Sequence, residues 1–329
     1  MPRSLLRRRL LRGLLAAPLI ARSAHAASPG DVYPSRPVRI IVPFAAGGGA
    51  DVVARALAQL LSERLGQSCV VDNRPGGAGN IGTEAVARAA PDGHTLLLTG
   101  PSHVINAYLF HQLPFDPLHG FAPIALLTAA PYVLVAGPAL PARGFGELLA
   151  LARAAPAPLA YGSAGNGTAG HLAMEIVKAE AGIEMVHVPY RGSPQLLTDL
   201  MAGRVAVAFD NVLSSSPGIA AGQLRALAVS SLRRTPSLPE IPTIAEAGLP
   251  GFDVTVWQGA LAPAGTDPGI IHRLGAEMAI ALQSAEMRAR LATLGVEAIG
   301  GEPAGFVRFL DDEARRWAEA VRRSGARLD

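Results

Sequence analysis

The sequence predicts an α/β protein of two lobes, each a mostly parallel sheet flanked by helices, with a two-strand hinge between them. Short apolar segments alternate with helical segments through most of the chain, which is the pattern of parallel sheets. Two breaks in this alternation, near residues 130 and 240, indicate a middle lobe inserted into an outer one. The chain would then cross twice between the lobes, above a cleft.

The first 26 residues have the features of an export signal. Five arginines precede a short apolar run at residues 14–20, which is far below the roughly 20 residues that a membrane-spanning helix needs. The sequence Ala24-His25-Ala26 fits the small-x-small cleavage pattern, so we expect a signal peptide of residues 1–26 and a periplasmic mature chain. The basic stretch also loosely resembles a twin-arginine signal, but we expect the Sec route.

Removal of this leader reverses the sign of the net charge. The full chain carries 29 basic and 26 acidic residues, a formal charge of +3. The leader holds six arginines and no acid, so the remaining chain carries 23 basic against 26 acidic residues, a charge of −3. This balance gives no support for nucleic acid or an anionic membrane as a partner.

The outer lobe begins with a regular alternation of strands and helices. We expect strands at residues 38–42, 69–72 and 95–99 and helices at residues 51–65 and 81–89. Asp51 is the expected N-cap of the first helix. The apolar segments 124–127 and 132–135 predict two strands separated by a kink at Ala130-Pro131.

The middle segment continues the alternation until a proline-rich run at residues 235–242 interrupts it as a surface connection. We expect helices at 145–154 and 168–181 and strands at 159–162, 185–188, 205–209 and 224–229. A strand at 254–261 and helices at 268–283, 285–294 and 303–324 follow, the last of them amphipathic. Lobe 1 is therefore predicted to contain residues 27–129 and 250–329, and lobe 2 residues 130–249.

Two glycine-rich loops, at residues 43–51 and 163–171, each follow a predicted strand and open onto a predicted helix. A helix start presents unpaired backbone N–H groups and the positive end of the helix dipole. Such a point binds anions without an Arg or Lys side chain. Ligands of parallel sheets bind beyond the carboxyl ends of the strands, where both loops fall. The two loops therefore predict one small anion held from both lobes.

The candidate ligand-binding residues come mainly from these loops. In the first loop, backbone amides would bind a carboxylate, and the ring of Phe44 would form a wall of the cleft. These amides are those of Ala46, Gly47, Gly48, Gly49 and Ala50. In the second loop, the hydroxyls of Ser163 and Thr168 would donate hydrogen bonds to the ligand in addition to backbone amides. The candidate residues of this loop are Ser163, Gly165, Asn166, Gly167, Thr168 and Ala169. The alternative for both loops is a tight strand-to-helix turn in which glycine only permits a positive φ.

Two ionisable side chains are further candidates with open roles. His171 lies one turn into the predicted helix and would either contact the ligand or only pack in the lobe. Asp210 ends a predicted strand, where it could accept a ligand hydroxyl or amine or anchor a water. No metal site is predicted, because His103, His111 and His119 recur at a spacing of eight, which does not place them on one helical turn.

Six segments spread over the mature chain closely resemble the extracytoplasmic solute receptors of tripartite tricarboxylate transporters, often called the Bug family. They are residues 33–44 (YPSRPVRIIVPF), 72–82 (DNRPGGAGNIG), 90–96 (APDGHTL), 163–168 (SAGNGT), 186–192 (VHVPYRG) and 261–266 (LAPAGT). The resemblance implies a periplasmic-binding-protein fold of type II that closes on a carboxylate. It also implies integral-membrane permease subunits as partners, and we expect the receptor to be a monomer.

The chain departs from the family pattern at three positions. Ala46 stands where the family usually has Pro, and Ala50 where it often has Thr or Ser. Gly218 stands where a His is expected. The change at Ala50 removes a hydroxyl donor from the first loop, which leaves the usual ligand pose an open question.

Other functions fit the sequence less well. A dinucleotide-binding enzyme would use the strand at 38–42, the first loop and Asp72. Its Gly-x-Gly-x-x-Gly pattern fails here, because Val52 stands in place of the third glycine. A hydrolase lacks a Gly-x-Ser-x-Gly elbow. We therefore expect no catalytic residues and no cofactor. A sensor kinase in place of the permease stays open, and so does an uncharged carbonyl compound in place of the carboxylate.

Overall fold

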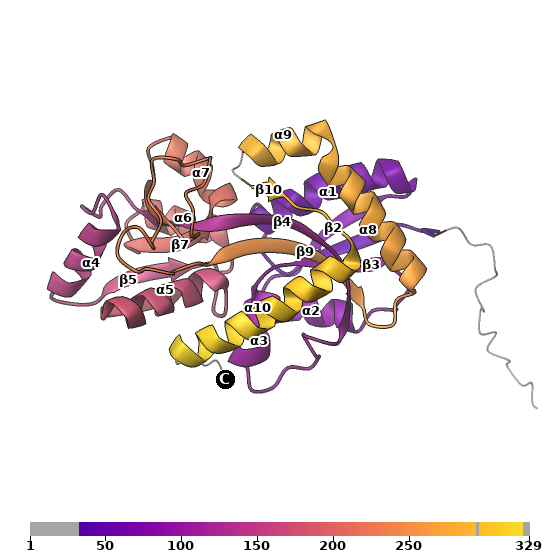
Figure 1. Ribbon diagram of the computed structural model, residues 1–329, viewed down its shortest axis with the longest axis horizontal. Helices are drawn as coiled ribbons and strands as arrows, with labels where there is room; N and C mark the ends of the chain where they lie inside the picture. The colour runs from indigo at the N-terminus through magenta and orange to yellow at the C-terminus, as the bar shows by residue number, and fades with distance from the viewer. Residues whose placement is uncertain (1–32, 294–295, 325–329) are drawn as a thin grey trace, which may run out of the picture. The chain divides into compact units, whose positions relative to one another are not determined.

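The computed structural model describes residues 33–293 and 296–324, which form one mixed sheet covered by helices (Figure 1). The predicted signal peptide lies outside the described residues. The strands are β1 Val38–Val42, β2 Cys69–Asn73, β3 Thr95–Thr99, β4 Phe121–Ala136, β5 Leu159–Ser163, β6 Met185–Pro189, β7 Val207–Asn211, β8 Arg225–Val229, β9 Thr255–Pro263 and β10 Glu297–Ala298. The helices are α1 Gly49–Leu65, α2 Asn80–Ala87, α3 Ser102–Leu109, α4 Phe145–Ala154, α5 Ala169–Ala181, α6 Ser193–Met201, α7 Val212–Ala220, α8 Pro268–Gln283, α9 Ala285–Thr293 and α10 Pro303–Ser324.

The predicted α/β class is confirmed, with a sheet that is mixed rather than mostly parallel. The strand order is β2-β1-β3-β9-β4-β7-β5-β6, and β8 and β10 also pair with β4. The outer strands are parallel, since β1 pairs in parallel with β2 and β3, and β5 with β6 and β7. The central pairs formed by β4 and β9 are antiparallel.

Strand β4 runs through the position where a kink was expected, so the prediction of two separate strands was wrong. Its 16 residues form one strand, in which Pro131 stays in register with Thr255 of β9. Proline removes only the N–H donor of its own residue and does not by itself end an extended segment. From Tyr132 onward the partners of β4 change from β9 to β7 and β8. The predicted lobe boundaries stay a prediction.

Three helices of the structure, α3, α6 and α7, have no counterpart in the sequence analysis. They are short, with eight or nine residues each. Pro194 stands in the first turn of α6 and Pro217 lies inside α7, so the usual periodicity is interrupted. The predicted bounds of α4, α8 and α10 agree with the structure.

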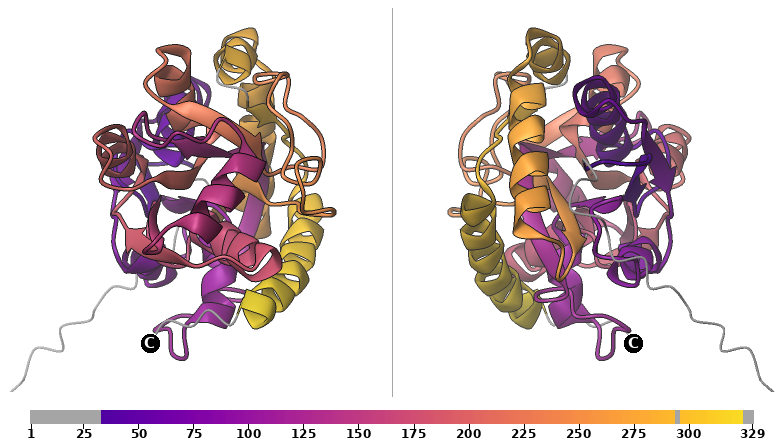
Figure 2. Two further views of the ribbon diagram at one scale, coloured as in Figure 1. Left: turned by 90° about the vertical axis from the view of Figure 1, so that its left-hand side faces the viewer. Right: turned by 90° about the vertical axis from the view of Figure 1, so that its right-hand side faces the viewer.

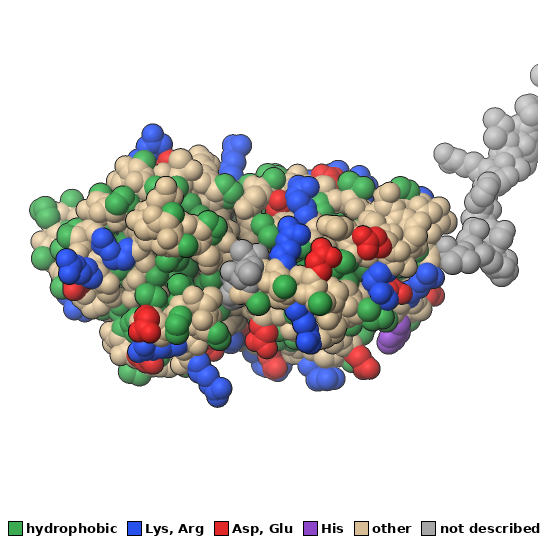
Figure 3. Space-filling view, turned by 90° about the horizontal axis from the view of Figure 1, so that it is seen from above, with side chains coloured by type: hydrophobic (Ala, Val, Ile, Leu, Met, Phe, Trp, Pro, Cys, Tyr) green, Lys and Arg blue, Asp and Glu red, His purple; other side chains and the backbone are tan. Residues whose placement is uncertain are grey.

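The C-terminal helices cover one side of the strands (Figure 2). Helix α10 packs against β4, α3 and α5, and α8 packs against β4 and α1. The apolar side of α10 is buried through Phe306, Trp317 and Val321, as its amphipathic pattern predicts. No helix in the described part of the chain is both long and apolar enough to cross a membrane. Figure 3 shows basic, acidic and apolar side chains interspersed on one face.

Gly259 of β9 allows α10 to approach the sheet closely. A Cβ at Gly259 would lie 2.2 Å from Cζ of Phe306, so the ring would have to move. We expect Gly259→Ala to lower the free energy of unfolding by about 1–3 kcal/mol, the usual cost of overpacking a core. Urea denaturation measures this change.

Gly146→Ala is the matched control, because a Cβ there would meet nothing within 4 Å and the residue lies in α4. This variant should be neutral or more stable by up to about 1 kcal/mol, since Ala favours helix over Gly. Equal stability of both variants would show that α10 does not press on β9.

Candidate functional site

A cavity of about 70 Å³ lies where strands and helices from both predicted lobes meet. Its walls contain aromatic rings, small residues and a few polar side chains. They are Phe44, Ala45, Gly48, Gly49, Ala50, Gly100, Pro101, Ser102, Tyr132, Ala164, Thr168, Gly170, Gly192, Ser193, Phe209, Asp210, Asn211, Val256, Trp257 and Gln258. No Arg, Lys or His of the described residues belongs to this lining.

Five helices begin at the wall of this cavity. The N-cap residues of α1, α3, α5, α6 and α7 all line it, and they are Gly48, Pro101, Thr168, Gly192 and Asn211. The first N–H groups of a helix have no backbone acceptor within it, and each start carries about half a positive charge. In α5 and α7 one of these groups is already bound by the N-cap side chain, His171 N–H by Thr168 and Ser214 N–H by Asn211. These helix starts therefore bring partial positive charge to the cavity wall without a cationic side chain. The sequence predicts two of the five starts, those of α1 and α5.

The first glycine-rich loop is held by Asp51, which is not the N-cap of α1 as predicted. Gly48 is the N-cap, and Asp51 lies in the first turn, buried. The Asp51 carboxylate accepts hydrogen bonds from the Gly47 amide at 2.9 Å, Arg55 Nε at 3.0 Å and Asn73 Nδ2 at 3.0 Å. Burial opposes ionisation of Asp51, but these hydrogen bonds outweigh it and lower its pKa.

Four of the six candidates in this loop line the cavity, namely Phe44, Gly48, Gly49 and Ala50. Ala46 and Gly47 do not belong to its lining. The prediction that the Gly47 amide holds a ligand is corrected by its hydrogen bond to Asp51, which uses that donor. The loop thus divides into residues that fix its shape and residues that face the cavity.

The second loop is held together by its own hydroxyls. Ser163 Oγ and Thr168 Oγ1 both donate to the carbonyl of Gly165, at 3.0 and 2.8 Å. Ser163 is fully buried and also lies 2.7 Å from His187 Nε2. Because each hydroxyl has one proton, neither is free to donate to a ligand in this arrangement. The predicted donation from Ser163 and Thr168 to a ligand would require these hydroxyls to turn away from Gly165, and it stays a prediction.

Among the candidates of the second loop, Thr168 alone lines the cavity, where Ala164 and Gly170 accompany it. Gly165 and Asn166, together with Thr168, line a wider groove of about 640 Å³. This groove shares Phe44, Ala164 and Thr168 with the cavity and so adjoins it. Gly167 and Ala169 belong to neither lining.

His171 is a packed histidine rather than a cavity residue. Its Nδ1 accepts a hydrogen bond from the Gly167 amide at 3.2 Å, and its ring stacks on His187 with centroids 4.0 Å apart. Burial lowers the pKa of His171, and burial and the neighbouring His171 lower the pKa of His187 to about 3. Both imidazoles are therefore neutral near pH 7 and support the loop.

Asp210 reaches the cavity from the end of β7. The residue is 1% exposed, and its two carboxylate oxygens accept hydrogen bonds from Ser193 Oγ at 2.5 Å and Ser215 Oγ at 2.9 Å. Burial raises the pKa of Asp210 to about 6 despite these hydrogen bonds. Burial and the nearby Asp210 also raise the pKa of Tyr132, which lines the same cavity.

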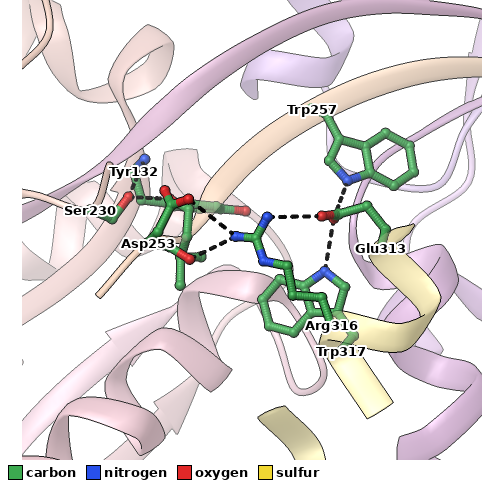
Figure 4. A network of polar contacts seen from close by, with 8 residues as sticks. Tyr132, Ser230, Asp253, Trp257, Glu313, Arg316 and Trp317 are labelled. Carbon is green, nitrogen blue, oxygen red and sulfur yellow. Dashed lines mark hydrogen bonds and ion pairs between the residues drawn. The ribbon is translucent and has the colours of Figure 1, made fainter. Parts of the chain in front are cut away.

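Trp257 connects the cavity wall to α10, as Figure 4 shows. Its Nε1 donates to Oε2 of the buried Glu313 at 2.7 Å, and Nε1 of Trp317 donates to the same oxygen at 2.9 Å. Arg316 contacts Glu313 at 3.3 Å and donates to the Asp253 carbonyl at 2.7 Å. Glu313 was not predicted as a buried residue, because it follows Asp311 and Asp312 and such an acidic run resembles a solvated helix face.

Loops from the two predicted lobes touch at the cavity. A Cβ at Gly49 would lie 2.6 Å from Asn211 Oδ1, and one at Gly167 would lie 2.8 Å from Asn106 Oδ1. A Cβ at Gly192 would lie 3.0 Å from Cβ of Ala45. Such contacts leave no space for further side chains at these three positions. Among the described residues no group of three or more metal-ligating side chains occurs.

The pKa of Asp210 predicts how stability changes with pH. The carboxyl group titrates near pH 6 in the folded protein and near pH 3.9 when unfolded, so folding is favoured by proton uptake as pH falls through this window. The cost of the buried charge is fully present above pH 6. Relative to Asp210→Asn, the wild type should gain about 2 kcal/mol of unfolding free energy between pH 7 and pH 4.5.

Urea denaturation at the two pH values gives this difference, and Asp312→Asn controls for loss of an exposed carboxylate. A wild-type profile parallel to that of Asp210→Asn would contradict a titration near pH 6.

Loss of Glu313 would leave two buried indole N–H groups without an acceptor. Each unsatisfied buried donor costs about 1–3 kcal/mol, so we expect Glu313→Ala to lower the free energy of unfolding by about 2–5 kcal/mol. Urea denaturation tests this value. Asp312→Ala, an exposed neighbour on α10, is the control and should change stability by less than about 0.5 kcal/mol. A similar loss in both variants would contradict a special role for Glu313.

Comparison with known proteins supports one family. Residues 53–326 match the family model described as the tripartite tricarboxylate transporter family receptor. Protein BugT of Bordetella pertussis is 38% identical over 300 residues, which cover 91% of this chain and 92% of that protein.

Two solved structures give the same indication. Rpa4515 of R. palustris with adipate has a TM-score of 0.87 and 38% identity, covering 90% of this chain and all of that chain. MatC of Rhodopseudomonas palustris with bound malate has a TM-score of 0.84 and 32% identity, covering 88% of this chain and all of that chain.

Proposed function

The chain belongs to the tripartite tricarboxylate transporter receptor family, and from this premise we propose that it is a periplasmic receptor for a small carboxylate. The ligand would occupy the cavity at the starts of α1, α3, α5, α6 and α7. Members of this family are solute receptors rather than enzymes.

The convergence of five helix N-termini on one cavity is the observation that carries this proposal. A carboxylate at a helix start gains typically about 0.3–1 kcal/mol from the dipole, and up to about 2 kcal/mol when partly buried. Several such starts around one anion replace the arginine that a carboxylate site would otherwise need. An uncharged carbonyl compound would use the same N–H groups but would gain less from the dipoles.

Closure would follow from ligand contacts with both lobes. A ligand shifts the equilibrium between an open and a closed form only by its difference in affinity for the two. The starts of α1 and α3 belong to predicted lobe 1, and those of α5, α6 and α7 to predicted lobe 2. A carboxylate between them would therefore stabilise the closed form, with β4 and β9 as the hinge.

Delivery to membrane permease subunits is the second part of the proposal. The family description names a transporter, and similar structures contain adipate and malate. We infer that this chain, exported through a cleaved signal peptide, presents a related acid to such subunits as a monomer. Mass spectrometry of small acids released from natively purified protein would identify the ligand directly.

Two adjacent glycines provide a sharp test of closure. A Cβ at Gly49 would press on Asn211 Oδ1, whereas the nearest atom to a Cβ at Gly48 is 3.4 Å away. Both alanine variants keep their backbone N–H groups, so a difference between them reports the steric contact and not the loss of a donor. We expect Gly49→Ala to weaken ligand binding by at least about tenfold, corresponding to about 1.4 kcal/mol.

Gly48→Ala is the control and should bind within about threefold of wild type. Isothermal titration with malate, adipate and the acid identified by mass spectrometry measures affinity, and small-angle scattering measures compaction on binding. Wild-type affinity and compaction in Gly49→Ala would contradict closure at this contact. If no carboxylate binds the wild type and none is released from it, the proposed function is wrong.

A further inference from the structure

The cavity combines an electropositive wall with one acidic side chain. Asp210 and Tyr132 are the ionisable residues among the described residues that line it, and neither supplies a positive charge. A carboxylate ligand beside Asp210 would meet a like charge in a buried place, which is unfavourable. An ionised Asp210 is therefore better placed against a part of the ligand other than its carboxylate.

The helix starts around Asp210 are not equivalent. Ser193, the first residue of α6, donates to Asp210, and Asp210 stands two residues before α7 begins. The Asp210 charge thus lies beside the starts of these two helices and offsets part of their positive charge. The starts of α1, α3 and α5 remain for an external anion, which divides the cavity into an anion-binding end and an acceptor end.

Asp210 retains capacity to accept a hydrogen bond. A carboxylate has about four acceptor sites. Ser193, Ser215 and the Asn211 amide use three of them. At neutral pH the group is mostly ionised and would accept from a donor placed in the cavity. A free carboxylic acid on the ligand is ionised at that pH, so the donor has to be a hydroxyl or an amino group.

We propose that Asp210 selects carboxylates that carry a hydroxyl or amino group on the carbon chain, by accepting a hydrogen bond from that group. This inference rests on the proposed function. A buried carboxylate with one unused acceptor site discriminates against an analogue without the donor, because that one site is then left without a partner. An unsubstituted acid would place CH₂ groups against Asp210.

Matched acids that differ only in the donor test this inference. Isothermal titration at pH 7.5 would compare succinate, malate and aspartate, and separately propionate, lactate and alanine. The wild type should bind the hydroxy or amino acid of at least one series roughly tenfold or more tightly than its unsubstituted analogue. Comparing the hydroxy with the amino member identifies which donor is recognised.

Asp210→Asn should bring this ratio toward one, because it removes the charge, and should leave the unsubstituted acid bound equally or more tightly. Asp312→Asn on the exposed part of α10 is the control and should keep the wild-type ratio. The wild-type comparison stands even if Asp210→Asn does not fold. Equal affinity within each series, or an unchanged ratio in Asp210→Asn, would overturn the inference alone. Failure of every carboxylate to bind the wild type would overturn the proposed function.

Discussion

The antiparallel pair of β4 and β9 is the constraint on which the rest of the site depends. It lies in the middle of the sheet, with the parallel strands β1 to β3 on one side and β5 to β7 on the other. The helices that follow β1, β3, β5, β6 and β7 all begin at the cavity. Tyr132 of β4 and Trp257 of β9 complete its wall, so one pair of strands places both the donors and the aromatic surface.

The electrostatics of the cavity arise from backbone rather than side chains. Helix starts supply partial positive charge that is fixed in direction and needs no reorganisation when an anion arrives. A lysine or arginine would add a full charge but would have to be desolvated together with the ligand. The acidic side chain of Asp210 offsets part of this positive charge.

The sequence was sufficient for the α/β class, for long helices such as α4, α8 and α10, and for two of the five helix starts. It was not sufficient where tertiary contacts determine which helix starts meet and which groups form hydrogen bonds. The starts of α3, α6 and α7 meet the others only after the sheet has formed, and prolines conceal two of these helices. The direction of a hydroxyl proton is likewise a tertiary property, so the sequence did not predict that Ser163 and Thr168 both contact the Gly165 carbonyl. Pro131 was expected to kink the chain, yet its pairing with Thr255 of β9 keeps β4 continuous.

A site made from main-chain donors has a consequence for sequence divergence. A side-chain replacement at residue 50, such as Ala for Thr or Ser, removes a hydroxyl but leaves the backbone N–H in place, so the proposed anion site would keep that donor. The few side chains that face the cavity are then free to evolve separately, and a change at one of them alters ligand preference without rebuilding the scaffold. Under the proposed function, two such receptors of similar overall sequence can therefore prefer different acids.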